Sequence, residues 1–463
     1  MRIKAKYKIM MEQIYLPLNS KIRLDKKKFR KKIINFFSRR LIGTSVYVKK
    51  TNVINKTIRL NHLSSGCHWV NIIASILWVK KPFIVDPSVT CIDFKTSFLI
   101  LDDVFPLDLY AWKPAEYNEI LQSMPEAEVL RLNTAESYAY NLTLEKCTDR
   151  SNKRITFLSD GTGIFIGDHI KLVLFQMYCG IESFNILELN RDFIMTFYPS
   201  GGFRLFDYEC NVKMKTICAS PHFKHMIVTQ KIMYDYFLMT KICPKEKMTL
   251  IFGGCGFPVY SERKPILSVN NICFLANSYG SDKGWKKGYD IFVSVAKNLI
   301  KKNKDLKFHV IGNGLDINTI DISSIKKHFF FHGRINLTDL KLLLEKMDMM
   351  ICPNRPHYFN DGGLDFDGFP VGCAAYGMMC GCPVFMTDPF DLNNGFYKNG
   401  HDFIQINFNP SEITFKIQYY IDRPDELNKI AQSGGNKTRE LISFDKQIKP
   451  RLNLYRHLLE QCK

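Results

Sequence analysis

From residue 266 to the end of the chain, short apolar runs alternate regularly with segments of helical periodicity. The runs are apolar at consecutive positions, which is typical of strands buried on both faces of a parallel sheet. The segments between them repeat their apolar residues at the spacing of one helix face. We therefore expect strands at residues 272–275, 308–311, 329–331, 349–352, 384–386 and 403–406, and helices at residues 289–299, 337–347, 371–379, 412–421 and 445–461.

A second, less regular alternation precedes this one. It predicts strands at residues 98–101, 193–197, 225–229 and 250–252, and a helix at residues 115–123. Gly253 and Gly254 then interrupt the pattern, and residues 261–265 have the composition of a linker. The chain is therefore expected to form two Rossmann-like, doubly wound α/β domains facing a cleft, with ligands at the carboxyl ends of the strands. The predicted parts are a basic extension at residues 1–91, the domains at 92–260 and 266–440, and a final helix at 441–463 that crosses back.

The basic residues are concentrated at the N-terminus. The whole chain carries a net charge of +19, but residues 1–50 hold sixteen Lys and Arg against Glu12 and Asp25, a net of +14, which leaves +5 for the remainder. The rest of the chain therefore lacks the strongly basic surface of a nucleic-acid-binding domain, and nucleic acid is not the expected partner.

Residues 24–41 have the pattern of a basic amphipathic helix. Phe29, Ile33 and Phe37 recur on one face, and lysines flank them. Apolar anchors beneath a lysine-rich face suit an anionic membrane surface. Two alternatives stay open, namely a helix docked on the protein with a solvated basic face and a basic arm that binds RNA or DNA.

The fourteen cysteines are scattered, without the C-x-x-C spacing of a zinc or redox site. Free thiols and a reducing compartment are the simplest interpretation, so we expect a cytoplasmic protein, peripheral at the membrane if residues 24–41 bind it. The N-terminus lacks the pattern of a secretory signal, and the longest apolar stretch, residues 69–79, is about half the length that spans a bilayer. No metal site and no cofactor are expected.

The most informative segment is Asp367-Gly368-Phe369-Pro370, which leads into an apolar helix. A carboxylate beside a glycine-bearing turn can accept hydrogen bonds from sugar hydroxyls. The unpaired N–H groups and positive dipole end of the helix that follows can hold a diphosphate. The alternative is an ordinary loop in which Asp367 only caps the helix.

This segment resembles the donor-site signature of glycosyltransferase family 4, and in particular a subset that reads D-G-F-P-T-G at the same turn. Lys287-Gly288-Tyr289-Asp290 is similar to the K-G-x-D segment of that family, residues 306–314 to its strand ending in G-x-G, and residues 329–334 to its nucleobase loop. The resemblance implies a GT-B fold and a glycosyltransferase that moves a sugar, with retention, from a nucleoside diphosphate-sugar to a glycan or a lipid-linked acceptor. It also implies that lysine and a helix N-terminus replace a metal ion at the diphosphate.

The resemblance assigns roles to individual residues. Lys287 would bind the donor phosphates and Asp367 the sugar ring, and these are the expected catalytic residues. Residues 193–203 look like the acceptor-side strand and loop, which places Gly201 and Gly202 near the acceptor; the alternative is a simple turn. The remaining donor-binding candidates are Gly368, Phe369, Pro370, Tyr376, Asn277, Gly333, Arg334 and Asn354.

Two positions depart from the family pattern. Tyr376 stands where the family has a glutamate that binds the nucleotide ribose, and Asp367 stands where most members have glutamate. A tyrosine offers one hydroxyl in place of two carboxylate oxygens. The alternative function is therefore a catalytically impaired GT-B scaffold or a glycan-binding protein. Asp361 and Asp365 are expected to be solvated, and His309 to pack in the core.

Overall fold

The computed structural model describes most of the chain from residue 96 onward. The described residues are 96–102, 105, 112–131, 155–157, 169–176, 191–198, 203–253, 265–278, 282–315, 318–393 and 396–462, with the backbone of 46–47, 57–58, 92–93 and 164–165. The predicted helix at residues 24–41 and the candidate residues Gly201 and Gly202 lie outside this part.

The chain separates into two compact units, one of residues 1–94 with 160–166 and one of residues 95–159 with 167–463. In the first unit, β1 (Val46–Tyr47) pairs antiparallel with β2 (Thr57–Ile58). β3 (Ile92–Asp93) pairs in parallel with β7 (Ile164–Phe165). Residues 160–166 thus group with the N-terminal segment, although they lie within the range predicted for the first doubly wound domain.

The first large sheet of the second unit has seven parallel strands in the order β11-β10-β9-β8-β4-β5-β6. The predicted strand at 250–252 is wrong by two residues, because the chain pairs with β10 from Met248 onward. The strands are β4 (Phe98–Asp102), β5 (Ala127–Arg131), β6 (Ile155–Phe157), β8 (Leu172–Gln176), β9 (Asp192–Phe197), β10 (Phe223–Val228) and β11 (Met248–Leu250), and the helices between them are α4 (Trp112–Ser123), α7 (Tyr208–Cys218) and α8 (Lys231–Met239), with a 3-10 turn at Lys245–Lys247.

The second large sheet has six parallel strands in the order β14-β13-β12-β15-β18-β19. An antiparallel hairpin, β16 (His357–Tyr358) and β17 (Leu364–Asp365), is inserted after β15. The strands are β12 (Asn271–Leu275), β13 (Lys307–Ile311), β14 (Phe329–Gly333), β15 (Met349–Cys352), β18 (Val384–Thr387) and β19 (Ile404–Ile406), and the helices are α9 (Tyr289–Leu299), α10 (Leu337–Leu344), α11 (Gly372–Met379), α12 (Pro410–Ile421) and α13 (Pro424–Ile442), with a 3-10 turn at Ser323–His328. The predicted helix at 337–347 was too long, because its last turn ends at Leu344.

Helices cover both faces of the six-stranded sheet. Neighbouring residues of β12 point to opposite faces, so that Ile272 and Phe274 pack into one apolar cluster with α9, α12 and α13, and Cys273 packs into another with α10 and α11. Such double coverage is why its strands read as continuous apolar runs in the sequence. Two parallel, doubly wound α/β domains were predicted, and both are confirmed.

Helix α13 was not predicted, and its two adjacent glycines explain why. A Cβ atom on Gly434 would lie 2.1 Å from the carbonyl oxygen of Asp402, and one on Gly435 would lie 3.0 Å from the carbonyl oxygen of Met378. Glycine is therefore needed for α13 to approach the loop before β19 and helix α11 this closely. In a sequence the same Gly-Gly pair indicates a break, because glycine disfavours helices.

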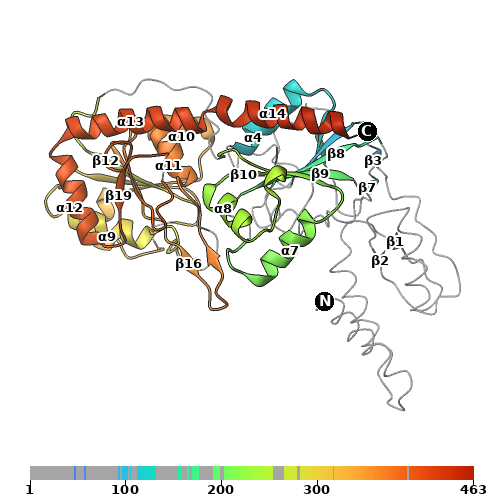
Figure 1. Ribbon diagram of the computed structural model, residues 1–463. Coiled ribbons are helices and arrows are strands. Elements are labelled where there is room, and N and C mark those ends of the chain that lie inside the picture. The colour runs from blue at the N-terminus through green and yellow to red at the C-terminus, as the bar shows by residue number, and fades with distance from the viewer. Residues whose placement is uncertain are drawn as a thin grey trace, which may run out of the picture. The chain divides into compact units, whose positions relative to one another are not determined.

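The last helix, α14 (Phe444–Gln461), follows α13 after a single residue (Figure 1). It contributes Ile448, Leu452 and Tyr455 to the apolar core of the seven-stranded sheet, where it packs against α4. Arg451 Nη1 donates to Glu116 Oε2 of α4 over 2.5 Å, and the hydroxyl of Tyr455 donates to Glu116 Oε1 over 2.7 Å. The end of the chain is thus built into the first domain. Among the described residues, no helix is both long and apolar enough to cross a bilayer.

Candidate functional site

Three candidate residues lie at the carboxyl ends of strands in the six-stranded sheet. Gly333 ends β14, Asn277 follows β12, and Asn354 follows β15, while Gly312 at the end of β13 lies between the first two. All these strands are parallel, so their carboxyl ends meet at one edge. This edge is where ligands bind in doubly wound sheets.

The segment Lys287-Gly288-Tyr289-Asp290 is held against the loop after β15. Gly288 has φ +77°, and a Cβ atom there would lie 2.3 Å from the carbonyl oxygen of Pro353. The carboxylate of Asp290 accepts two hydrogen bonds from Arg355, over 2.6 and 2.8 Å. Arg355 also donates to the carbonyl of Trp285 over 2.8 Å. The close approach of Gly288 and the hydrogen bonds of Asp290 thus fix this segment against the loop after β15 and position the side chain of Lys287 at the site.

Lys287, Asp367 and Asn354 form one polar cluster. Lys287 Nζ lies 2.6 Å from Asp367 Oδ2, and Asn354 Nδ2 donates to the same oxygen over 2.8 Å. The Lys287 and Asp367 side chains are 26% and 24% exposed, whereas Asn354 is buried. The two predicted catalytic residues and one predicted donor-binding residue therefore meet, although 80 residues separate the lysine from the aspartate.

The charges of this cluster depend on one another. Burial alone would raise the pKa of Asp367, but the charge and hydrogen bond of Lys287 and the amide of Asn354 hold it below its usual range. Burial alone would lower the pKa of Lys287, but Asp367 raises it. Both groups are therefore ionised at neutral pH, and an ammonium and a carboxylate are available to a ligand.

The turn before α11 is shaped by a close contact with α8's first residues. Gly368 has φ +86°, and a Cβ atom there would lie 2.6 Å from the side chain of Gln230. Gln230 Oε1 accepts from the backbone N–H of Phe369 over 3.0 Å, and its Nε2 donates to the carbonyl of Pro370 over 3.3 Å. The Phe369–Pro370 peptide bond is cis. The glycine of the D-G-F-P motif thus lets this turn receive Gln230, which was not predicted.

The start of α11 is open. Its cap residue, Val371, offers no side-chain acceptor to the first N–H groups of the helix. A Cβ atom on Gly372 would meet no atom within 4 Å. Unpaired N–H groups at a helix start carry partial positive charge and favour an anion, the more so beside the ammonium of Lys287.

Tyr376 lies one turn further along α11. Its side chain is 8% exposed and belongs to the apolar cluster between α11 and the sheet. The next residue, Gly377, packs so closely that a Cβ atom would lie 2.8 Å from the sulfur of Met350. Tyr376 is therefore largely a packing residue, with only a small part of its ring at the surface.

Asn277 and Gly333 lie together at the other part of this edge. Asn277 Oδ1 accepts from the backbone N–H of Asn313 over 2.9 Å, and the N–H of Gly312 donates to the carbonyl of Gly333 over 2.8 Å. Gly333 has φ +61°, with no atom within 4 Å of a Cβ position. Arg334 follows it directly. These residues form a second group beside the lysine cluster, with open space in front of Gly333.

A second lysine–aspartate pair lies beside the first. Lys286 Nζ is 2.9 Å from Asp365 Oδ2, with side-chain exposures of 33% and 31%. Contrary to expectation, Asp365 is therefore not simply solvated, whereas Asp361 is solvated as predicted, at 52% exposure, and also pairs with Arg204 Nη1 at 2.9 Å. Both partners are distant in sequence, so local pattern could not reveal them. Asp365 and Asp367, two residues apart in the sequence, are thus each paired with a lysine.

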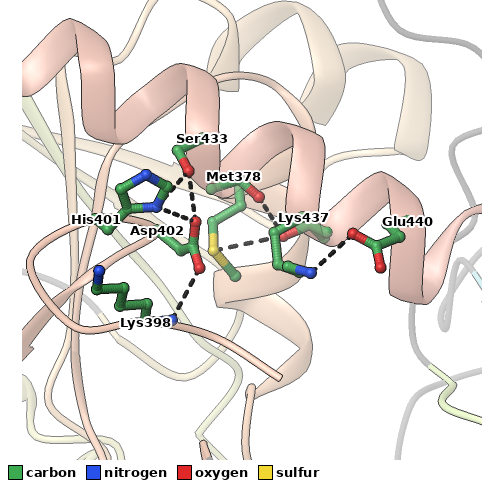
Figure 2. A network of polar contacts seen from close by, with 9 residues as sticks. Met378, Lys398, His401, Asp402, Ser433, Lys437 and Glu440 are labelled. Carbon is green, nitrogen blue, oxygen red and sulfur yellow. Dashed lines mark hydrogen bonds and ion pairs between the residues drawn. The ribbon is translucent and has the colours of Figure 1, made fainter. Parts of the chain in front are cut away.

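His401, Asp402 and Ser433 form another polar cluster, which ties the loop before β19 to α13 (Figure 2). Asp402 Oδ1 and Ser433 Oγ lie 2.8 and 2.7 Å from the same ring nitrogen of His401, Nδ1. A catalytic triad needs its acid and its nucleophile on opposite ring nitrogens. Asp402 also accepts from the N–H of Lys398 over 2.8 Å. This cluster therefore holds α13 against the loop before β19.

Residues 270–421 match the family model described as glycosyl transferases group 1. This segment contains the lysine cluster, the open start of α11 and the Asn277 group. No curated protein matches the sequence.

Two solved structures share the arrangement of both domains. Alr3699/HepE from Anabaena, solved with UDP and glucose, superimposes with a TM-score of 0.54 at 11% identity, over 78% of this chain and 100% of that one. Sucrose-phosphate synthase from Thermosynechococcus elongatus gives 0.53 at 12% identity, over 79% and 100%. The chain has the GT-B fold.

TarM gives a lower TM-score of 0.46 at 13% identity, over 62% of this chain and 54% of TarM. The chain thus spans about half of the length of TarM. At these identities the solved structures show the GT-B fold alone, and residues 270–421 of the second domain are similar to the group 1 glycosyltransferases.

Proposed function

We propose that this protein is a glycosyltransferase that moves a sugar from a nucleoside diphosphate-sugar to a hydroxyl of a glycan or lipid-linked acceptor, with retention at the anomeric carbon. The observation that carries the proposal is the cluster of Lys287, Asp367 and Asn354 beside the open start of α11. The group 1 match over residues 270–421 and the GT-B fold support it.

The cluster suits a diphosphate because its lysine can change partners. Asp367 neutralises Lys287 when no anion is bound, and a diphosphate at the start of α11 would attract the ammonium more strongly than one carboxylate does. Asp367 would keep its hydrogen bond from Asn354 and would gain room for the hydroxyls of the sugar. The lysine and the helix N–H groups would then stabilise the charge that develops on the leaving diphosphate.

The two residue groups at the sheet edge suggest which part of the donor each group would bind. The diphosphate and sugar would lie at Lys287 and Asp367, and the nucleoside would lie at Asn277, Gly333 and Arg334. The open space in front of Gly333 supports a ligand there. Alr3699/HepE was solved with UDP, which makes UDP the first nucleotide to try.

Thermal unfolding of the whole chain against a panel of nucleoside diphosphates and their sugar conjugates tests the proposal. A ligand at about 100 times its dissociation constant adds about 2.7 kcal/mol of stability, which raises the melting temperature measurably. We expect one nucleobase to shift the melt and the others to shift it little. If no nucleotide shifts the melt, the donor site does not bind its donor.

The alternative function is a GT-B scaffold or glycan-binding protein with an impaired donor site, and Tyr376 favours it. The side chain is packed among apolar residues, and it replaces the acid of the resembling family. Tyr376→Glu separates the two functions, with Tyr376→Phe as the control for loss of the hydroxyl alone. A large gain in nucleotide affinity on Tyr376→Glu supports the impaired site, and unchanged affinity supports a donor site that works with tyrosine.

A further inference from the structure

Two cysteines face each other inside the proposed donor site. Cys352 is the last residue of β15, and Cys373 is the second residue of α11. Their Sγ atoms are 3.7 Å apart and share a hydrogen bond. Both are free thiols, and a disulfide would need the sulfurs only about 1.7 Å closer, at about 2.05 Å.

The two thiols differ in access and in charge. Cys352 is 2% exposed, whereas Cys373, at the start of α11, is half-buried. The hydrogen bond from Cys352 and the charge of Lys287 lower the pKa of Cys373, against the effect of burial. The hydrogen bond to Cys373 and burial raise the pKa of Cys352. Cys373 is thus suited to react first as a thiolate, and Cys352 to attack second.

We propose that Cys352 and Cys373 are a peroxide-sensitive thiol pair that closes into a disulfide between the end of β15 and the start of α11. In the first step the thiolate of Cys373 attacks one oxygen of hydrogen peroxide, giving a sulfenic acid and hydroxide. In the second step the sulfur of Cys352 attacks the sulfenic sulfur, the S–O bond breaks and water leaves. The two thiols lose two electrons, and one peroxide becomes two waters.

The position of the pair gives the disulfide a consequence for ligand binding, and this step rests on the proposed function. The loop between the two cysteines carries Asn354, Asp365 and Asp367, so a bond that pulls β15 and α11 together moves the ends of this loop. The diphosphate proposed for the start of α11 would in turn cover Cys373. Nucleotide binding and oxidation should therefore oppose each other.

Peptide mapping tests the thiol pair without any nucleotide. The whole reduced protein is treated with limiting hydrogen peroxide, its remaining thiols are alkylated, and its peptides are identified by mass spectrometry with and without reduction. We expect one reducible peptide pair that joins Cys352 to Cys373. Alkylation of both cysteines after peroxide, with no such pair, overturns the proposal.

The chain supplies an internal control in Cys218 and Cys243. The neighbouring Cys243 and burial raise the pKa of Cys218, and both residues are buried, at 6% and 2% exposure. Cys352 and Cys373 should be linked at least about tenfold faster than this control pair, because Cys373 is less buried than either control thiol and its pKa is lowered. Equal rates would contradict the assigned role of Cys373.

Two variants separate the order of the steps. In Cys352→Ala the sulfenic acid on Cys373 has no partner, so a dimedone adduct should accumulate there. In Cys373→Ser the thiol of Cys352 should stay reduced at the same peroxide dose. If Cys352→Ala unfolds the protein, Cys373→Ser alone still decides, because oxidation of Cys352 in that variant would overturn the order.

UDP gives the last measurement. Saturating UDP should slow the linking of Cys352 to Cys373 at least about tenfold and leave Cys218 and Cys243 unaffected. Linking without UDP protection, in a protein whose melt UDP does shift, would overturn the placement of the pair inside the donor site. Linking in a protein whose melt no nucleotide shifts would uphold the thiol pair and reject the proposed function.

Discussion

Several ion pairs join distant parts of the described chain, and two of them differ greatly in their access to solvent. Arg451 and Glu116, between α14 and α4, have side-chain exposures of 2% and 1%. Lys287 and Asp367, before α9 and α11, have side-chain exposures of 26% and 24%. The first pair is enclosed by the aromatic residues Tyr198 and Tyr455, which contact it through their hydroxyls.

The difference in access separates two uses of the same chemistry. A pair that no ligand can reach can only hold two helices together, and breaking it leaves a buried charge. A pair at an open helix start can exchange its carboxylate for another anion at little cost, because water and the incoming anion replace the lost contact. Mutations should therefore affect stability at Arg451 and activity at Lys287.

The largest effect is expected for Arg451→Met. It leaves the carboxylate of Glu116 buried without its cation, which costs about 3–5 kcal/mol of unfolding free energy. Urea unfolding, followed by circular dichroism, measures the loss. Because α14 packs in the core of the first domain, that domain should lose its structure first.

The double variant Arg451→Met with Glu116→Gln serves as the control. Removing both charges removes the unpaired carboxylate, so the double variant should recover most of the lost stability. A double variant as unstable as the single one would show that packing of the arginine, and not its charge, is what α14 requires. The contrast between a structural ion pair at Arg451 and a functional ion pair at Lys287 would then no longer hold.

The next largest effect is expected for Lys287→Ala, and it concerns turnover. On the proposed function, loss of the ammonium at the diphosphate lowers kcat/KM about 10²- to 10³-fold, as the loss of one preorganised charge does in other enzymes. The melting temperature should change little, because the pair is partly exposed. Sugar transfer from the nucleotide identified by the melting panel measures the loss.

Lys437→Ala is the matched control for this variant. Lys437 pairs with Glu440 on α13 at 2.8 Å, in the same domain but on an exposed surface. Its loss should leave turnover and melting temperature unchanged. Equal losses of turnover in the two variants would mean that the total positive charge of the domain, and not Lys287 in particular, affects the reaction.

Most of the second domain could be predicted from the sequence, because its strands are buried on both faces. The helix at residues 289–299 and the strand at residues 349–352 were predicted with the observed ends. Strands β5 and β8 were not predicted. The sequence of β5, AEVLR, mixes polar with apolar residues, whereas that of β8, LVLFQ, is a continuous apolar run like those of the predicted strands. Helix α13 was missed because Gly434 and Gly435, which its packing requires, resemble a loop.

Only those residues of the site that lie in local sequence motifs could be predicted. Lys287 and Asp367 were named because their segments resemble a known family, and the structure brings them into contact. Gln230 and Lys286 were missed, because each is defined by a partner 139 or 79 residues away. A single sequence shows which residues lie near a turn, whereas the partner across the fold depends on packing that only the structure shows.

The buried His309, in contact with His332, gives a contrasting case, in which the buried group must stay neutral. His309 Nδ1 lies 2.9 Å from His332 Nε2, and burial and the charge of His332 lower the pKa of His309 to about 4. An unfolded histidine titrates near about 6.5, so the unfolded chain binds more protons between these values. The associated stability is complete above about pH 6.5 and is lost as the pH falls toward 4.

We therefore expect acidification from pH 7 to pH 5 to cost about 1 kcal/mol at this site, after allowance for screening by solvent. Urea unfolding at a series of pH values, compared between the wild type and His309→Asn, measures this contribution. The variant should show a smaller slope of stability against pH. An identical slope would mean that His309 does not couple folding to protonation, whereas the ion pairs at Arg451 and Lys287 should be unaffected in this pH range.

The smallest effect is expected for Lys286→Ala, next to Lys287 in the chain. Lys286 pairs with Asp365 at 2.9 Å, much as Lys287 pairs with Asp367 at 2.6 Å. Its pair is more exposed, at 33% and 31%, and lies over the ring of Phe359 instead of beside an amide such as Asn354. A partly exposed pair of this kind contributes less than about 1 kcal/mol.

Turnover of Lys286→Ala should therefore stay within about threefold of wild type, and its melting temperature within a few degrees. Turnover of Lys286→Ala is measured with the same donor as turnover of Lys287→Ala. Because the two lysines are one residue apart, the comparison tests whether the position of the ammonium group or positive charge alone determines turnover. A loss as large as that of Lys287→Ala would place both ammonium groups on the diphosphate. Access to solvent would then not be enough to distinguish the functional ion pair from its neighbour. The anion site at the open start of α11 would then include both lysines.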